Sequence, residues 1–124
     1  RNGGTKRNIM YALKNKVQLI GNLGNAPEVK TFESGKKVAN FRMATTEVYR
    51  NAKGEKVKET QWHNLVMWGK LAEIAEKHLT VGKEVAVEGK LVNRQYTDKD
   101  GNKKFFTEIQ VNELLMLGVK AAEE

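Results

Sequence analysis

Both tryptophans of the chain, Trp62 and Trp68, fall in one ten-residue stretch, ETQWHNLVMW, at positions 59–68. An indole ring can interact in two ways. It can bury a large apolar surface in a core, or it can present a flat π face on which another planar group stacks. Lysine and arginine recur in the neighbouring segments, and cations attract an anionic partner. The secondary-structure elements that carry these rings determine whether they are buried in a core or displayed for stacking.

Residue types suited to catalysis or metal binding are sparse and do not converge. The chain has no cysteine, which excludes thiol chemistry and thiolate zinc sites. Its two histidines, His63 and His78, stand fifteen residues apart, with no third ligand at a suitable spacing. No serine, histidine and aspartate arrangement suggests itself, and the glycines belong to separate turns and not to a phosphate loop. We therefore expect no catalytic residues, no metal site, no cofactor and no enzymatic activity.

Alternation along a strand sorts ETQWHNLVMW onto two faces, because successive side chains point in opposite directions. The two faces are Trp62, Asn64, Val66 and Trp68 on one side, and His63, Leu65 and Met67 on the other. Burial of Asn64 would be costly, so the face with the tryptophans is expected to point away from the core. His63 shares the inward parity, which favours a buried or subunit-interface histidine over a catalytic base.

The same rule applied to residues 38–49 and 84–96 extends the outward-facing set. The residues expected inside are Phe41, Met43, Val85, Val87, Gly89 and Leu91, and those expected outside are Arg42, Lys90, Val92, Arg94 and Tyr96. Exposed rings beside cations suit single-stranded nucleic acid, because rings stack on any base while cations follow the phosphates. Core packing is the competing interpretation for each ring alone. Tyr49 has inward parity and is exposed only if its strand ends or bulges first.

Five strands and one helix are expected to position these residues. Strand patterns cover residues 16–32, 38–49, 59–68, 84–96 and 105–117, with the first interrupted between Gly21 and Pro27. Helical spacing appears in 69–83, with Gly82 placed to end the helix, and Asp100–Gly101 predicts a hairpin. An all-β fold with one α-helix between strands 3 and 4 is typical of the five-stranded OB-fold, a Greek-key barrel. A five-stranded sheet with a covering helix is the alternative.

Length and charge bound the class of protein. A chain of 124 residues with 40% hydrophobic content fits a single globular domain, and no stretch is long and apolar enough to span a membrane. The net charge is +7, but residues 10–124 hold 19 basic and 15 acidic residues, and a surplus of +4 is weak support for a nucleic-acid partner. We expect a cytoplasmic protein with a flexible leader or cloning remnant at 1–14, the barrel domain at 15–117 and the start of a C-terminal tail at 118–124.

Several motifs in order resemble the bacterial single-stranded DNA-binding protein family across about residues 15–117. They are NKVQLIGNLGNAPEV, VANFRMATTEVYR, ETQWHNLVMWGKLAEIAEKHLTVGKEVAVEGKL and RQYTDKDGNK. The resemblance implies a homotetramer of OB-fold barrels that binds single-stranded DNA without sequence preference in replication, recombination and repair, in association with the nucleoid. The stacking positions of the family match Tyr49, Trp62, Trp68 and Tyr96, which favours exposure of Tyr49. Tyr49 and Tyr96 stand where tryptophan is familiar in the family, and Trp68 stands where phenylalanine is.

The resemblance also implies phosphate and subunit contacts. The phosphate-binding residues expected by motif position are Lys16, Lys30, Arg50, Lys58, Lys70 and Arg94, and His63 matches a subunit-interface histidine. Family members carry basic residues where this chain has Asn64, Thr80, Val81 and Val92, so fewer backbone contacts are expected. The family usually continues into a flexible tail with an acidic tip that recruits replication and repair proteins, and residues 121–124 are not that tip. The alternative function is a primosome-type OB-fold interaction module whose exposed aromatic rings bind a protein partner.

Overall fold

The computed structural model describes residues 14–118, which form six strands and one helix. The strands are β1 (Val17–Leu23), β2 (Glu28–Thr31), β3 (Lys37–Arg50), β4 (Lys56–Trp68), β5 (Glu84–Thr97) and β6 (Lys103–Met116). The helix α2 (Lys70–His78) lies between β4 and β5. Except for residues 14 and 118, the expected leader and tail lie outside the described residues.

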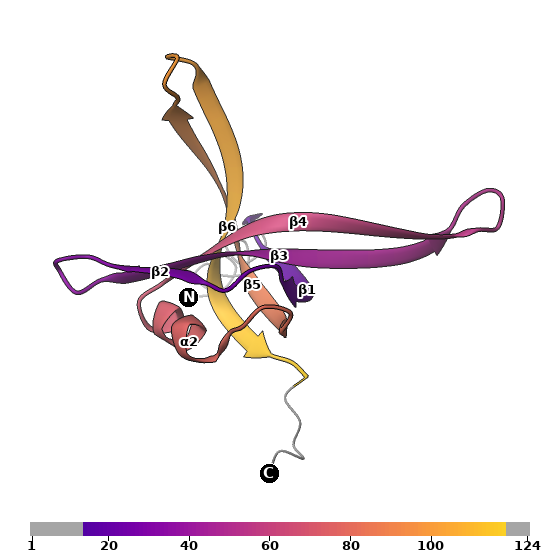
Figure 1. The fold of residues 1–124 in the computed structure, drawn as a ribbon, viewed down its shortest axis with the longest axis horizontal. Helices are drawn as coiled ribbons and strands as arrows, with labels where there is room; N and C mark the ends of the chain where they lie inside the picture. The colour runs from indigo at the N-terminus through magenta and orange to yellow at the C-terminus, as the bar shows by residue number, and fades with distance from the viewer. Residues whose placement is uncertain (1–13, 119–124) are drawn as a thin grey trace, which may run out of the picture.

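The strands close into a barrel (Figure 1). The sheet order is β1-β5-β6-β4-β3-β2, and a further pairing of β1 with β3, where Leu23 lies opposite Met43, joins the ends. A side chain at Gly21 or Gly89 would lie 2.1 Å from a backbone carbonyl oxygen of the neighbouring strand, so these glycines permit the close approach that closure needs. The closed barrel, with helix α2 between β4 and β5, confirms the predicted OB-fold and excludes the open-sheet alternative.

The first predicted strand is interrupted, as expected, at residues 24–27 between β1 and β2. The break stays attached to β3 through the backbone of Arg42. The Arg42 N–H donates to Asn25 Oδ1 at 2.9 Å, and the Gly24 N–H donates to the Arg42 carbonyl at 2.7 Å. These bonds hold Gly24, Asn25 and Arg42 side by side.

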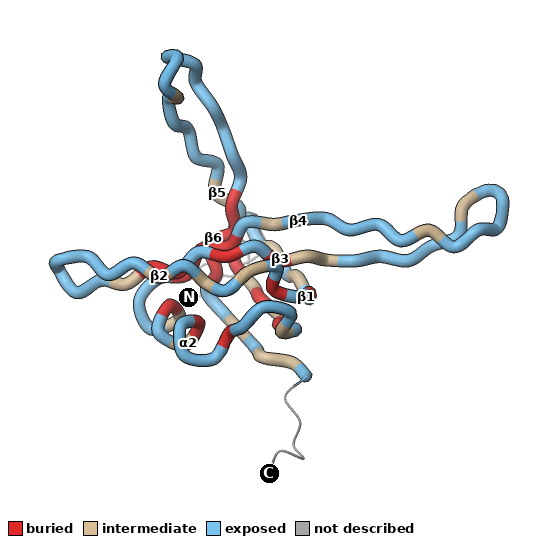
Figure 2. Tube along the Cα trace, viewed as in Figure 1, coloured by how far each residue is buried: buried red, intermediate tan, exposed pale blue. Residues whose placement is uncertain are grey.

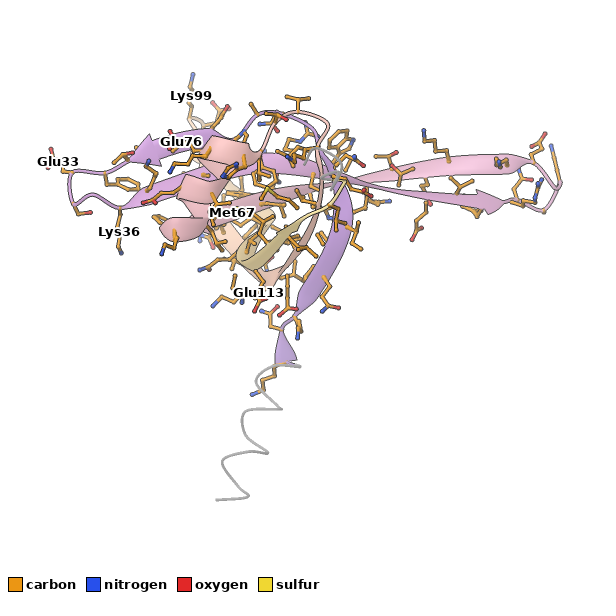
Figure 3. All side chains as sticks on the ribbon, turned by 90° about the horizontal axis from the view of Figure 1, so that it is seen from below. Glu33, Lys36, Met67, Glu76, Lys99 and Glu113 are labelled. Carbon is orange, nitrogen blue, oxygen red and sulfur yellow. The ribbon has the colours of Figure 1, made fainter. Side chains whose placement is uncertain are left out.

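The core fills the interior of the barrel, where the buried residues of Figure 2 gather. Leu65 and Met67, both predicted to face inward, are 2% and 0% exposed, and Met43 and Val85 are fully buried beside them. Figure 3 shows Met67 among closely grouped side chains in the body of the molecule. One face of β4 is therefore core, as alternation predicts.

Two residues contradict the predictions from alternation. Val66, predicted to face outward, is 3% exposed. At this position β4 is paired with β3 on one side and with β6 on the other, so residues of both strands flank Val66. Leu91, predicted to face inward, is 47% exposed. The pairing of β5 with β1 ends before it, and its backbone N–H and carbonyl bond instead to the side chain of Asn15.

Helix α2 packs against β3 and β4. It begins after Gly69, whose φ of +62° lies in the left-handed region that favours glycine. Ala72 and Ala75 form its buried side. The helix ends at His78, before Gly82, which shapes the following turn with φ +86°. No helix within residues 14–118 has the length and apolar character needed to cross a membrane.

Two long hairpins extend from the barrel as exposed two-stranded arms, and the shorter β2–β3 hairpin projects as well (Figures 1 and 2). We call the two long hairpins the β3–β4 arm, residues 46–60, and the β5–β6 arm, residues 92–107. Their tips use the same device: Oδ1 of Asn51 and of Asp98 each accept two backbone N–H groups of their own turn. Gly101 has a φ of +84°, which confirms the hairpin predicted from Asp100–Gly101.

Candidate nucleic-acid interface

The two tryptophans lie on the outer face of β4, as alternation predicts. Trp62 is 51% exposed and Trp68 is 39% exposed, and the intervening Asn64 is exposed too. The same strand buries Leu65 and Met67 on its other face. The barrel wall therefore holds both indoles from behind, while part of each ring remains open to a partner.

Arg42 covers part of the Trp62 ring, with its guanidinium carbon 4.5 Å from the ring centroid. Gly24 also contacts this ring, because a Cβ at residue 24 would lie 2.4 Å from Trp62 Cζ3. Alternation correctly predicts that Arg42 faces outward. Its contact with Trp62 was missed, because only the register of β3 against β4, which sets Arg42 opposite Asn64, brings the two side chains together.

Trp68 is stacked against Phe32, with ring centroids 6.1 Å apart and planes inclined by 15°. Lys30 Nζ lies 5.1 Å from the Phe32 centroid, so a predicted phosphate-binding residue stands beside the aromatic pair. Phe32 is 38% exposed and was missed by the sequence analysis. Its position directly after β2 and before a lysine-containing turn is the signal that marks it.

Tyr96, 51% exposed on the β5–β6 arm, contacts Phe106 edge to face with centroids 5.9 Å apart. Phe105, at 68% exposed, lies next to it on β6. Neither phenylalanine was predicted from the sequence. The register of the hairpin, which sets Arg94 opposite Phe106, would have placed Phe106 near Tyr96 had the length of the turn been known.

Tyr49 lies on the β3–β4 arm, opposite Val57, and is 46% exposed. The strand neither ends nor bulges before it. It leaves the barrel and continues as one half of a two-stranded ribbon, and such a ribbon has no interior. Inward parity therefore does not bury Tyr49, and the expected exposure is confirmed.

The predicted phosphate-binding residues are divided among different surroundings. Arg94 Nε is bonded to the carboxylate of Glu108, and Arg50 Nη1 donates to the Gly54 carbonyl at 2.8 Å within the tip of its arm. Lys16 Nζ lies 3.5 Å from Glu88, on the β1–β5 side of the barrel. Lys58 and Lys70 are exposed, on the β3–β4 arm and at the start of α2, and within residues 14–118 neither forms an ion pair.

His63 lies on the opposite face of β4 from the tryptophans. Its Nε2 lies 2.9 Å from Thr45 Oγ1, within hydrogen-bonding distance. Partial burial lowers the pKa of His63 below its ordinary value. The neutral imidazole is therefore favoured, and its role as a subunit contact stays a prediction.

A groove with about 480 Å³ of open space lies beside the Arg42 and Trp62 pair. The residues that line it are Asn25, Glu28, Asn40, Phe41, Arg42, Asn64, Leu65, Phe106 and Glu108. Its lining combines amide, carboxylate and guanidinium groups with the apolar residues Phe41, Leu65 and Phe106. Groups of three or more histidine and acidic side chains able to hold a metal ion are absent from the part of the chain that the structure describes.

A closed OB-fold barrel that displays aromatic rings and cations on its surface and its arms defines a class of protein suited to binding an anionic polymer with planar bases. The family comparison makes the class specific. The family model described as "Single-strand binding protein family" matches residues 14–117, and the chain belongs to this family.

Relatives and solved structures agree with this assignment. The chain is 46% identical over 107 residues to Single-stranded DNA-binding protein 1 of Chlorobaculum tepidum, covering 86% of this chain and 66% of that protein. It is 45% identical over 104 residues to the Single-stranded DNA-binding protein of Neisseria meningitidis serogroup A, covering 84% of this chain and 60% of the relative. The chain thus spans less than two thirds of the length of these relatives. The fold matches the Plasmodium falciparum SSB complex with ssDNA with a TM-score of 0.77 and 33% identity, over 83% of this chain and 94% of that one.

Proposed function

We propose that this protein binds single-stranded DNA without sequence preference and protects it during replication, recombination and repair. The observation that carries the proposal is the set of exposed rings beside cations on one barrel and its two arms. Each base offers a flat face for stacking, and lysine and arginine neutralise phosphates. Duplex DNA hides these base faces, so the chemistry favours single strands. The activity is binding and not catalysis.

The residues proposed to stack on bases are Tyr49, Trp62, Trp68 and Tyr96, and those proposed to contact phosphate are Lys16, Lys30, Arg50, Lys58, Lys70 and Arg94. Exposure of the four rings supports the first set. Arg94 and Arg50 are held by other groups of the protein in the free state, so their contacts with phosphate would need rearrangement or their remaining donors. The names of the relatives, and the complex of a similar structure with ssDNA, support the same polymer as ligand.

A homotetramer is part of this proposal. An apolar row crosses the outer face of β1, β5 and β6, where Ile20 lies opposite Ala86 and Ala86 lies opposite Leu115. Ile20 is 61% exposed and Leu115 is 62% exposed, and they line a shallow groove. Large exposed apolar residues grouped on one face are typical of protein contacts, and this row supports self-association. His63 is proposed as a further subunit contact.

Recruitment of replication and repair proteins through an acidic C-terminal tail is proposed for the whole protein. The chain spans only 66% and 60% of its two relatives, which leaves room for such a segment. A cytoplasmic location with association to the nucleoid is proposed from the ligand, since the DNA of a bacterial cell lies there.

Binding of a fluorescein-labelled oligo-dT, followed by anisotropy, tests the proposal. Trp62→Ala and Trp68→Ala should each weaken binding roughly 5- to 150-fold, which corresponds to about 1 to 3 kcal/mol for one stacked base. Their thermal midpoints should stay close to that of the wild type, because both rings are exposed. His78→Ala removes an exposed planar ring from the last turn of α2 and serves as the matched control, expected to bind like wild type.

Competition with duplex DNA separates this proposal from its alternative. A single-strand binder should prefer oligo-dT over a duplex of equal length. Equal affinity for both, or no binding at low salt, would favour the primosome-type interaction module that binds a protein partner. A large loss of thermal stability in both tryptophan variants would instead mean that the rings act as core.

A further inference from the structure

Arg42 is the one arginine in the described part of the chain whose guanidinium rests on an aromatic ring. Its guanidinium carbon lies 4.5 Å from the centroid of Trp62, a distance typical of a cation–π contact. Trp62 is one of the rings proposed to stack on a base. The guanidinium occupies part of the ring face on which a base would stack. A base can stack there only if the Arg42 side chain moves away.

The backbone of Arg42 is anchored, while its side chain is not. Its N–H donates to Asn25 Oδ1 and its carbonyl accepts from the Gly24 N–H, so the position of its Cα is fixed by the break between β1 and β2. The guanidinium makes no hydrogen bond or ion pair with residues 14–118 beyond its contact with the Trp62 ring. An exposed cation–π contact is weak, so the side chain can exchange it for a stronger partner without disturbing the fold.

The positive charge of Arg42 lies in a groove that also holds two carboxylates. Glu28 and Glu108 line this groove, and a carboxylate repels a phosphate. The carboxylate of Glu108 is already bonded to Arg94. Arg42 is therefore the arginine of this groove that remains available to an incoming backbone, and its planar fork of donors fits phosphate oxygens.

We propose, on the basis of the proposed function, that Arg42 covers Trp62 in the free protein and binds a DNA phosphate in the complex. The base of the incoming nucleotide takes the place of the guanidinium on the indole, and the released guanidinium neutralises a neighbouring phosphate. Arg42 is then a further DNA-binding residue, and it keeps the exposed indole covered while no DNA is bound.

The salt dependence of binding tests the phosphate contact. An oligo-dT of about eight nucleotides is short enough to occupy a single barrel. Arg42→Ala should lower its affinity at low salt and reduce the magnitude of the log–log salt slope by about 0.7, the value for one phosphate on a single strand. Arg42→Lys keeps the charge and should keep the slope. Lys77→Ala removes an exposed cation from α2 and is the matched control, expected to leave the slope unchanged.

Quenching of tryptophan fluorescence by acrylamide tests the covering of the ring. In a Trp68→Phe background Trp62 is the single tryptophan of the chain. Adding Arg42→Ala should raise the quenching of the free protein, and Arg42→Gln, which keeps a planar end group without charge, should raise it less. Thermal midpoints near that of the background protein confirm that the variants are folded.

The outcomes separate the two proposals. An unchanged salt slope in folded Arg42→Ala, with wild-type binding intact, overturns the role of Arg42 and leaves the proposed function standing. Wild-type protein that does not bind oligo-dT at low salt overturns both. A reduced slope with unchanged quenching of the free protein overturns the exchange, because Arg42 would then contact phosphate without ever covering the ring.

Discussion

The rings of this interface are held by neighbours before any ligand binds. The pairs are Trp62 with Arg42, Trp68 with Phe32 and Tyr96 with Phe106. A side chain that is already fixed loses less conformational freedom on binding, so more of the stacking energy contributes to affinity. The neighbours differ in chemistry: one is a cation that can leave for a phosphate, and two are apolar rings that can extend the stacking surface.

His63 makes the stability of the fold depend on pH. Burial lowers its pKa in the folded state below the value of about 6.5 expected for the unfolded chain. Above that value both states hold a neutral imidazole and His63 contributes nothing to the dependence. As the pH falls below about 6.5 the unfolded chain binds a proton more readily than the folded protein, so stability decreases until the lowered pKa is passed.

The comparison of wild type with His63→Gln isolates this effect. We expect the thermal midpoint of the wild type to fall relative to that of the variant between about pH 7 and pH 5. Circular dichroism melts of the two proteins in matched buffers measure the difference, and carboxylates common to both cancel. Parallel midpoints over this range would contradict the prediction. Thr45 Oγ1, which lies 2.9 Å from His63 Nε2, offers a hydrogen-bond partner to the glutamine amide.

At the scale of the elements, alternation along a strand predicts burial in the barrel but not in the arms. This difference limits what sequence alone predicts. Alternation identified Leu65 and Met67 as core because the barrel gives every strand an inside and an outside. It failed for Leu91, where the β1 neighbour is lost, and left Tyr49 undecided, because a two-stranded arm has no inside. The contact of Arg42 with Trp62 depends on the register between strands, which no local pattern fixes.

The arms should also differ from the barrel in local stability. Residues 46–60 are almost entirely exposed, whereas the central parts of β3 and β4 hold core residues. We expect backbone amides of the β3–β4 arm to exchange with deuterium roughly tenfold faster or more than those of residues 39–43 and 65–67. Hydrogen–deuterium exchange followed by mass spectrometry measures the rates.

Addition of oligo-dT should then slow exchange in the β3–β4 arm if Tyr49 stacks on a base. Residues 85–87 of β5, buried or half-buried in the barrel, serve as the internal control and should change little. An arm that is as protected as the barrel before binding would contradict the first expectation. Exchange rates in the arm that stay unchanged at saturating DNA would contradict stacking by Tyr49.

At the scale of the whole molecule, the rings proposed to bind DNA and the apolar row proposed to join subunits form two surfaces. The rings Trp62 and Trp68 lie on β4, and their partners are Arg42 of β3 and Phe32, which directly follows β2. The apolar row of Ile20, Ala86 and Leu115 lies on β1, β5 and β6. Polar groups border this row, where Gln18 donates to Glu88 at 3.0 Å and this bond lowers the pKa of the Glu88 carboxyl. β5 contributes to both surfaces, with Ala86 in the row and Tyr96 in the arm. Because Trp62 and Trp68 lie on a different strand from the row, subunits can associate through the row while these two rings stay open to DNA.

A double substitution on the apolar row tests this separation. Ile20→Glu with Leu115→Glu places like charges on residues that are 61% and 62% exposed, so the barrel should fold while the proposed tetramer dissociates. Size-exclusion chromatography with light scattering measures the mass.

Affinity for an oligo-dT of about eight nucleotides should stay within about twofold of wild type, because one barrel suffices for it. Affinity for a strand long enough to reach several barrels should fall roughly 100-fold or more, because linked sites are lost. Val81→Glu, equally exposed in the loop after α2, is the control and should keep the wild-type mass. A double variant that keeps the wild-type mass would place the subunit contact elsewhere, and a loss of short-strand binding would show that the two surfaces are not independent.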